Sequence, residues 1–278
     1  MQEQDTQETA QTTLKQETKE QETKEQETPT APTILLNPKI DFKPSEEVLL
    51  KGAKTRYKAN IKAIELLKEL QAKQEILKSD YYATQEEQEI LAQFSGWGGL
   101  ESYFKKDQRP KEFKELNALL TKDEFRRAYS STRDAYYTPK LVIDSIYQGL
   151  DQLGFNNDNH QKEIFEPSLG TGKFIAHAPS DKNYRFMGTE LDPISANISK
   201  FLYPNQVIQN TALENYQFYQ EYDAFVGNPP YGNHKIYSSN DKELSNESVH
   251  NYFLGKAIKE LKDEWYRGVC GEFLVYGW

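Results

Sequence analysis

The sequence predicts an α/β fold, in which helices cover a parallel sheet, and three observations support this prediction. Short apolar runs alternate with helical patterns through the C-terminal half of the chain. Two glycines, Gly170 and Gly172, follow the first apolar run, where a strand would turn into a helix. An Asn-Pro-Pro-Tyr turn at 228–231 follows the fourth run. Strands that alternate with helices imply a parallel sheet in a layered domain.

Five short apolar strands are predicted, at 164–165, 185–190, 206–209, 223–226 and 272–276. Prolines cannot donate to a sheet ladder, so the fourth strand must stop at Asn228. In a sheet of this kind the fourth strand neighbours the first, and ligands bind where the carboxyl ends of the strands meet. We therefore expect the glycine loop and the Asn-Pro-Pro-Tyr turn to lie side by side.

The chain is predicted to have three parts. Residues 1–43 are expected to be a disordered tail, because the pentad Gln-Glu-Thr-Lys-Glu recurs there and the first 33 residues contain almost no apolar side chains. Residues 44–130 are expected to form a small helical domain, with a long amphipathic helix at 54–78 followed by two capping-box sequences. The sheet domain is expected to occupy 131–278.

Two features of the helical domain leave alternatives open. Three glycines surround Trp97 at 95–100, which suits the lining of a site or, as the favoured interpretation, a packed structural turn. The long helix begins with a basic run that either contacts phosphates or, more simply, forms a solvated face; the run consists of Lys51, Lys54, Arg56, Lys58 and Lys62.

A further helix is predicted after Tyr-Thr-Pro at 137–139. Thr138 is expected to cap this helix and Pro139 to be its first residue, where a missing N–H has no cost. Gly154 is expected to end it. Its predicted apolar side consists of Val142, Ile143, Ile146, Leu150 and Leu153.

Composition limits the class of protein. The net charge is −9, of which residues 1–33 carry −5, and this acidity weakly opposes DNA as a partner, although local patches matter more than the total. The single cysteine, Cys270, excludes an internal disulfide framework and a multi-cysteine zinc site. No apolar run is long enough to span a membrane, and the N-terminus lacks a signal-peptide pattern. We therefore expect a soluble cytoplasmic protein.

An acidic residue follows the glycine loop at a sequence separation that is typical of nucleotide-binding sheets. Glu190 follows Gly172 by 18 residues and ends the next predicted strand. A carboxylate in this place binds ribose hydroxyls in doubly wound sheets, whereas a surface carboxylate at a strand end is the simpler alternative. The loop is not a nucleoside-triphosphate loop, because Pro167 and Phe174 stand where a glycine and a hydroxyl residue are needed. The pair suggests a ligand that carries an adenosine-like ribose.

Five stretches together resemble the S-adenosylmethionine-dependent N6-adenine DNA methyltransferases. Four of them are Tyr-Thr-Pro at 137–139, Glu-Pro-Ser-Leu-Gly-Thr-Gly-x-Phe at 166–174, Gly-Thr-Glu-Leu-Asp-Pro at 188–193 and Asn-Pro-Pro-Tyr at 228–231. The fifth, Phe-Ser-Gly-Trp-Gly-Gly-Leu at 94–100, resembles the large methylase–helicase fusions of phages, plasmids and integrative elements. The resemblance implies a Rossmann-like methyltransferase sheet of about five parallel strands, with S-adenosylmethionine as cofactor and double-stranded DNA as partner.

The resemblance also implies roles for individual residues. Glu190 would take the ribose hydroxyls, and Leu191 would pack on the adenine of the cofactor. Asn210 or Thr211 stands where the family often has an acid in contact with that adenine. Further cofactor contacts are implied for Thr138, Glu166, Ser168, Gly170, Gly172 and Pro230.

The implied chemistry belongs to the Asn-Pro-Pro-Tyr turn. The side-chain oxygen of Asn228 and the carbonyl of Pro229 would accept the two N6 hydrogens of adenine, each contributing about 3 kcal/mol. Pro230 would also touch the cofactor. Tyr231 would stack on the flipped base, which is worth roughly 1–3 kcal/mol. The reaction needs no metal and no general base before transfer.

The last residues lie inside or just after the fifth predicted strand. The family continues beyond this point with strands that close the sheet and a DNA-recognition region. We therefore expect a truncated or split enzyme of weak or no autonomous activity, with a C-terminal half or a helicase encoded separately. The residues also leave two other functions open: methylation of protein glutamine or RNA, and a non-catalytic binding module.

Overall fold

The computed structural model describes residues 37–44, 50–78, 80–133, 138–158, 160–230, 232, 234–262 and 274–276. The chain divides into two units, Met1–Leu36 and Asn37–Trp278, and every described residue belongs to the second. The greater part of the predicted tail therefore lies outside the described residues.

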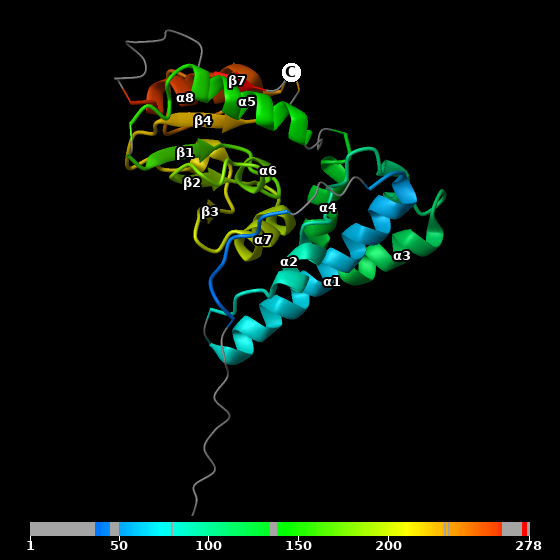
Figure 1. Ribbon diagram of the computed structural model, residues 1–278. Coiled ribbons are helices and arrows are strands. Elements are labelled where there is room, and N and C mark those ends of the chain that lie inside the picture. Colours follow the sequence, from blue (N-terminus) through cyan, green and yellow to red (C-terminus); the bar gives the residue numbers. More distant parts are fainter. Residues whose placement is uncertain are drawn as a thin grey trace, which may run out of the picture. The chain divides into compact units, whose positions relative to one another are not determined.

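A parallel sheet of five strands forms the centre of the sheet region, in the order β3-β2-β1-β4-β7 (Figure 1). The strands are β1 (Lys162–Glu166), β2 (Tyr184–Thr189), β3 (Val207–Gln209), β4 (Ala224–Gly227) and β7 (Leu274–Tyr276). The predicted α/β fold with a Rossmann-like parallel sheet is confirmed, and each strand lies within two residues of its predicted range.

The register brings the carboxyl ends of three strands level. Phe165 of β1 is paired with Met187 on one side and with Phe225 on the other. Glu166, the last residue of β1, is paired with Gly188. A Cβ at Gly188 would lie 2.6 Å from the Glu166 carbonyl oxygen, so β1 and β2 pass each other without room for a side chain at this point.

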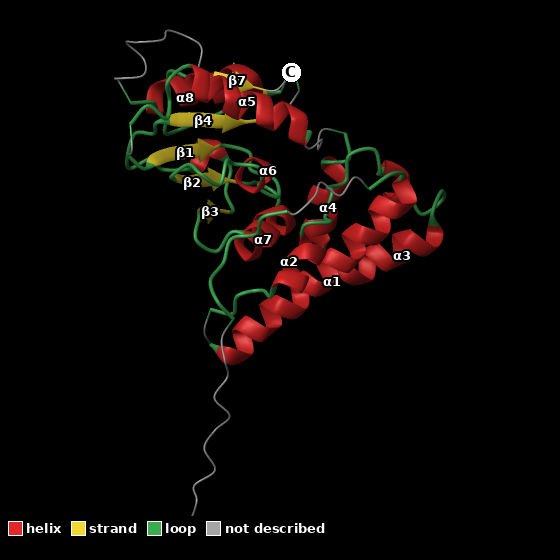
Figure 2. Ribbon diagram, in the orientation of Figure 1, coloured by secondary structure: helices red, strands yellow, loops and turns green. Residues whose placement is uncertain are grey.

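The helices are α1 (Ala53–Leu77), α2 (Gln85–Leu91), α3 (Pro110–Leu119), α4 (Lys122–Ser130), α5 (Lys140–Gln152), α6 (Lys173–Ala176), α7 (Pro193–Leu202) and α8 (Val249–Glu260). Two short 3₁₀ turns lie at Glu101–Phe104 and Leu213–Asn215. A small antiparallel pair, β5 (Lys235–Ile236) and β6 (Glu247–Ser248), precedes α8. Figure 2 distinguishes the helices from the strands by colour.

Both faces of the sheet are covered. Along β1, Ile164 belongs to one apolar cluster with residues of α5, α6 and α7, and Phe165 belongs to a second cluster with residues of α8. Met187 and Phe225 flank Phe165 in the second cluster. Strands buried on both faces carry continuous apolar runs, which explains why β4 reads Ala-Phe-Val-Gly with all four residues buried.

The glycine-rich stretch around Trp97 is a packed structural turn, as favoured from the sequence. Trp97 is buried and meets Phe94 and Phe104 edge to face. The buried amide of Asn60 donates to the Gly96 carbonyl at 2.7 Å, and its oxygen accepts from the Ser95 N–H at 2.9 Å. The turn is thereby fixed to α1.

The predicted start of α5 is wrong. The helix begins at Lys140, and Pro139, with an extended ψ of 146°, occupies the capping position. Thr138 lies one residue too early and makes no capping hydrogen bond, because a cap must directly precede the first helical residue. The predicted end is confirmed, since Gly154 has φ 86° and donates to the Asp151 carbonyl.

The predicted apolar side of α5 is partly wrong. Ile143, Ile146 and Leu150 are buried, but Val142 and Leu153 are exposed. Successive helical residues are about 100° apart, so Val142 points away from the side that Ile143 buries. Tyr147 fills the core in their place, and its hydroxyl donates to the Phe174 carbonyl at 2.9 Å.

The helical region is joined to the sheet region at α7. Gln88 of α2 donates to the Phe201 carbonyl at 3.1 Å, and the Phe42 N–H donates to the Leu202 carbonyl at 2.7 Å.

Thr84 and Thr121 form the two predicted capping boxes at the starts of α2 and α4. Among the described residues, no helix combines the length and the hydrophobicity needed to cross a membrane.

Candidate functional site

The candidate site lies at the carboxyl ends of β1 and β4. These strands are direct neighbours, and the loop after β1 is tied to the turn after β4 by one hydrogen bond. In that bond the Ser168 hydroxyl donates to the Asn228 carbonyl at 3.0 Å. The structure therefore brings the glycine loop and the Asn-Pro-Pro turn together, as the predicted strand order requires.

The glycine loop has a conformation that only glycine adopts readily. Gly170 and Gly172 have φ of 56° and 70°, in the left-handed region. A Cβ at Gly172 would overlap the buried ring of Tyr203 and lie 2.9 Å from its Cδ2. The Ser199 hydroxyl of α7 donates to the Gly170 carbonyl at 2.8 Å. Packing and hydrogen bonds thus hold the loop in one shape.

Glu190 directly contacts this loop. One carboxylate oxygen accepts from the Gly170 N–H at 2.7 Å, and the other accepts from the Asp192 N–H at 2.7 Å. Burial, together with the charge of Asp192, raises the pKa of Glu190 to about 7. The carboxyl group therefore titrates near neutrality and is oriented by two backbone donors.

Two further carboxyl groups lie close to Glu190. Burial, and after it the charge of Glu190, raises the pKa of Glu166 well above its ordinary value. Burial also raises the pKa of Asp192, which caps α7 by accepting from the Ser195 N–H at 2.9 Å. A ligand with a positive charge or several donors would stabilise these carboxyl groups in their ionised form.

Polar atoms without partners gather at the same place. Among the described residues, five buried side-chain polar atoms have no hydrogen-bond partner, and three of them belong to this site. They are Glu166 Oε2, Thr171 Oγ1 and Asp192 Oδ1. An unsatisfied buried polar group costs about 1–3 kcal/mol, so this cluster suits a polar ligand.

The other predicted site residues have varied surroundings. Asn210 is exposed, and its amide donates to the carbonyls of Glu190 and Leu191 at 2.7 and 3.2 Å. Leu191 is 57% exposed, an unusual state for an apolar side chain beside a polar cluster. Pro229 is buried and Pro230 partly buried.

Two predicted site residues remain predictions. Thr138, a predicted cofactor contact, is partly buried. Tyr231 lies outside the described residues.

Sequence reasoning missed four residues of the site: Thr171, Asp192, Ser199 and Tyr203. Asp192 before Pro193 is a recognisable helix start, so this sequence signal was available. The roles of Ser199 and Tyr203 depend on how α7 packs against the loop, and no local pattern reveals that packing.

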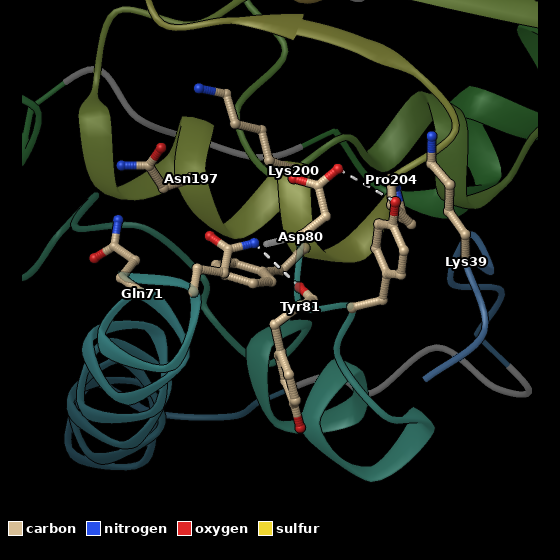
Figure 3. A pocket seen from close by; sticks show the side chains of 10 residues that line it. Lys39, Gln71, Asp80, Tyr81, Asn197, Lys200 and Pro204 are labelled. Carbon is tan, nitrogen blue, oxygen red and sulfur yellow. Dashed lines mark hydrogen bonds between the residues drawn. The ribbon is translucent and has the colours of Figure 1, made fainter. Parts of the chain in front are cut away.

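Two surface hollows lie elsewhere and include none of the predicted site residues. One, of about 260 Å³, lies between α1, α7 and residues 80–82. Figure 3 shows Lys39, Asp80, Asn197 and Lys200 around it, with a hydrogen bond from Gln74 to the Tyr81 carbonyl. The other, of about 350 Å³, is bordered by α5 and residues 177–182.

Comparison with known proteins gives two similar curated sequences, whereas no protein-family model matches the chain. A segment of 118 residues is 32% identical to Type II methyltransferase M.CvrRI of Paramecium bursaria Chlorella virus XZ-6E, covering 42% of this chain and 28% of that protein. A segment of 211 residues is 25% identical to Defense against restriction protein B of Escherichia phage P1, covering 74% of this chain and 8% of that protein. The chain thus spans less than a third of either relative.

Solved structures give more distant similarities. The methyltransferase subunit of a type I restriction-modification system from Streptococcus thermophilus has 20% identity and a TM-score of 0.39, over 56% of this chain and 41% of that one. A TehB-like SAM-dependent methyltransferase from Corynebacterium glutamicum has 18% identity and a TM-score of 0.29, over 50% and 64% of the two chains. The similarity to M.CvrRI confirms the resemblance to methyltransferases that the motifs predict.

Proposed function

We propose that this protein transfers the methyl group of S-adenosylmethionine to the N6 amino group of adenine in duplex DNA. The observation that carries the proposal is the hydrogen bond from Ser168 to the Asn228 carbonyl. It places a loop suited to the cofactor beside a turn suited to an amino-bearing ring. The similarity to a type II methyltransferase also supports methyl transfer as the proposed reaction.

The residues of the glycine loop fit the cofactor chemically. S-adenosylmethionine has a sulfonium and an amino group, which are cations, and ribose hydroxyls, which are donors. The acidic cluster of Glu166, Glu190 and Asp192 complements those groups, and the unpartnered oxygens of the cluster can accept their hydrogen bonds. Glu190 would take the ribose hydroxyls, and the exposed side chain of Leu191 would cover an adenine face.

The remaining predicted cofactor contacts extend along the same edge of the sheet. The left-handed glycines Gly170 and Gly172 let a ligand approach the backbone of the loop. Thr138, Ser168, Asn210 and Pro230 keep their proposed roles as neighbours of the cofactor. The bound cofactor would supply an electrophilic methyl group.

The Asn-Pro-Pro turn would hold the acceptor. Adenine N6 is a poor nucleophile because its lone pair is delocalised into the ring. The side-chain oxygen of Asn228 and the Pro229 carbonyl would accept its two hydrogens, which favours a pyramidal, more reactive nitrogen. A base inside a duplex cannot reach this turn, so it must flip out of the stack. Tyr231 is proposed to stack on the flipped base.

Residues 131–278 are proposed to carry out the reaction, and residues 44–130 are proposed to have an auxiliary role. It is tested by incubating the protein with duplex DNA and methyl-labelled S-adenosylmethionine, and identifying the methylated nucleoside by mass spectrometry. We expect N6-methyladenine. Replacing Asn228 by Ala should lower the rate about 10²–10³-fold, the usual effect of removing one oriented polar group at a reacting centre.

Asn117→Ala serves as the matched control. Asn117 is an exposed asparagine of α3 whose amide donates to the Phe113 carbonyl, away from the strand ends. This variant should keep the full rate. Absence of S-adenosylmethionine binding by calorimetry would reject the proposal. Labelling of RNA or of protein glutamine in place of DNA would reject the adenine assignment.

A further inference from the structure

The N-terminal half of α1 carries a stripe of three lysines, which we name the lysine stripe: Lys54, Lys58 and Lys62. All three are exposed, and they are spaced four residues apart, so they share one side of the helix. No acidic residue occurs from Leu50 to Ile64. Within the described part of the chain, none of the three forms an ion pair.

The charges of the stripe are unfavourable for an isolated helix. Like charges four residues apart repel each other. Lys54 also lies in the first turn, which contains no acidic residue, so its charge opposes the positive end of the helix dipole. The second half of the same exposed side is acidic, with Glu65 and Glu69. The positive charge is thus concentrated at one end of α1, where an anionic partner would relieve the repulsion.

The backbone beneath the stripe is fixed. Tyr57 stacks on Tyr103 with ring centroids 4.4 Å apart, and its hydroxyl donates to Glu115 at 2.6 Å. Asn60 is buried and bonded to the turn around Trp97. Arg56, the one cation of this segment that turns away from solvent, donates to the Ser95 hydroxyl at 3.2 Å. A partner would therefore meet a preformed row of charges.

The helix that carries the stripe reaches α7, the helix that Asp192 of the candidate site caps. Gln71 and Gln74 of α1 line one hollow together with Asn197 of α7. Lys68, which lies between the stripe and that hollow, forms an ion pair with Glu124 at 3.2 Å. Lys62 and Lys54 precede Lys68 by 6 and 14 residues, which places them about 9 and 21 Å along the helix axis from that contact.

We infer that the lysine stripe binds the phosphate backbone of the duplex DNA whose base enters the site. This inference rests on the proposed function for the identity of the partner. The lysines recur about every 6 Å along the helix axis, and one DNA strand has a phosphate for about every 3.4 Å of the duplex axis, so three lysines in a row suit a row of phosphates. With a net charge of −9 the chain as a whole repels DNA, and a local basic row is what offsets this.

The test is the salt dependence of DNA affinity. The variant Lys54→Gln/Lys58→Gln/Lys62→Gln removes three positive charges and keeps side chains with good helix propensity. Dissociation constants for a fluorescent duplex would be measured by anisotropy between about 50 and 200 mM salt. Losing three phosphate contacts should reduce the slope of log K against log salt by about 2.7, so that the affinity change over this range shrinks about 40-fold.

Two matched variants separate location from total charge. Lys39→Gln/Lys78→Gln/Lys200→Gln removes three exposed lysines from other parts of the chain and should leave the slope within about one unit of the wild-type value. Lys54→Arg/Lys58→Arg/Lys62→Arg keeps the stripe's charge and should bind like the wild type. Circular dichroism and thermal unfolding of each variant verify that the fold is kept.

An unchanged slope in the stripe variant would overturn the inference, as would equal changes in both Lys→Gln variants. A stripe effect seen with RNA hairpins and not with duplex DNA would also overturn it. The proposed function is tested separately, by measuring S-adenosylmethionine binding with calorimetry. A protein that binds cofactor and methylates DNA without using the stripe refutes only this inference. A protein whose DNA slope follows the stripe but which binds no cofactor refutes only the proposed function.

Discussion

The glycine loop and the Asn-Pro-Pro turn follow neighbouring strands, but they are held in different ways. The loop is fixed from several sides: its glycines adopt left-handed conformations, the Tyr203 ring fills the space beneath Gly172, and Glu190 accepts from the Gly170 N–H. The turn depends on proline stiffness and on contacts that include the bond that Asn228 receives from Ser168. The cofactor half of the site is therefore rigid by packing, whereas the acceptor half is rigid by its covalent structure.

This difference suggests that the two halves fail independently. A change beneath the loop should damage both folding and cofactor binding, because α7 and the sheet share that packing. A change at Ser168, which links the halves, should leave the fold intact and act mainly on how the acceptor is presented. Three variants test this division.

The largest effect is expected for Gly172→Ala. The new Cβ would overlap the Tyr203 ring, and alanine would have to adopt φ 70°. Left-handed backbone costs about 1–2 kcal/mol and overpacking about 1–3 kcal/mol, so unfolding free energy should fall by roughly 3 kcal/mol. Urea unfolding monitored by circular dichroism measures this loss, and calorimetry should show that S-adenosylmethionine binding is lost as well.

Gly149→Ala is the control for that experiment. Gly149 lies inside α5, and nothing stands within 4 Å of a Cβ placed there. Alanine should therefore stabilise the helix by about 0.5–1 kcal/mol. If Gly172→Ala were as stable as Gly149→Ala, the loop would not be held by packing, and the proposed difference between the loop and the turn would be refuted.

An intermediate effect is expected from the ionisation of Glu190, whose pKa is about 7. Only the ionised carboxylate accepts on both oxygens, so cofactor affinity should rise with pH through about 7 and then level off. Glu190→Gln should bind about 10–100-fold more weakly at high pH, as expected for losing a hydrogen bond to a charged group, and should lose this pH dependence. Calorimetry from about pH 5.5 to 8.5 measures both.

Folding stability should change with pH in the opposite direction to cofactor affinity. The folded-state pKa of Glu190 lies above the ordinary value of 4.5, so the folded protein binds more protons than the unfolded chain between these values. This group's contribution to stability is therefore largest at low pH and is lost as pH rises toward about 7. The stability difference between wild type and Glu190→Gln should follow that trend. A flat difference would mean that Glu190 is already ionised in the folded protein.

The smallest effect is expected for Ser168→Ala. It removes one hydrogen bond, worth about 1 kcal/mol, and should slow methyl transfer about fivefold with little change in stability. Because Ser168 is also a proposed neighbour of the cofactor, cofactor affinity should fall by no more than a similar factor. Ser145→Ala is the matched control, because Ser145 is an exposed serine of α5 whose hydroxyl donates to the Leu141 carbonyl. A loss of cofactor affinity at an unchanged rate would assign Ser168 to the cofactor half instead of to the link.

The layout of the sheet was predictable because short-range chemistry marks it. The apolar run of β1 is followed by Pro167 and that of β4 ends at Gly227, and the pairing of these two strands follows from the alternation of strands and helices. The packed turn at Trp97 followed from a large aromatic residue among glycines. In each case the local sequence and the fold favour the same conformation.

The finer geometry was not predictable, since it depends on contacts between distant segments. The cap of α5 is Pro139, one residue after Thr138, and the buried side of that helix includes Tyr147 in place of Val142. Glu190 was expected to bind ribose hydroxyls, and no pattern predicted that its carboxylate would accept from the Gly170 N–H 20 residues earlier. The support that Tyr203 gives to Gly172 depends on the packing of α7, for which the sequence contains no signal.

Gly188 has a consequence for how this gene can vary. Its missing side chain lets β2 pass the Glu166 carbonyl, which a Cβ would approach to 2.6 Å. Every other amino acid adds at least a Cβ, so any substitution at Gly188 places a side-chain atom against the backbone of β1. Arg185, exposed on the same strand, carries no such constraint. Inherited variation in β2 should therefore accumulate at its first residues and be removed near its carboxyl end.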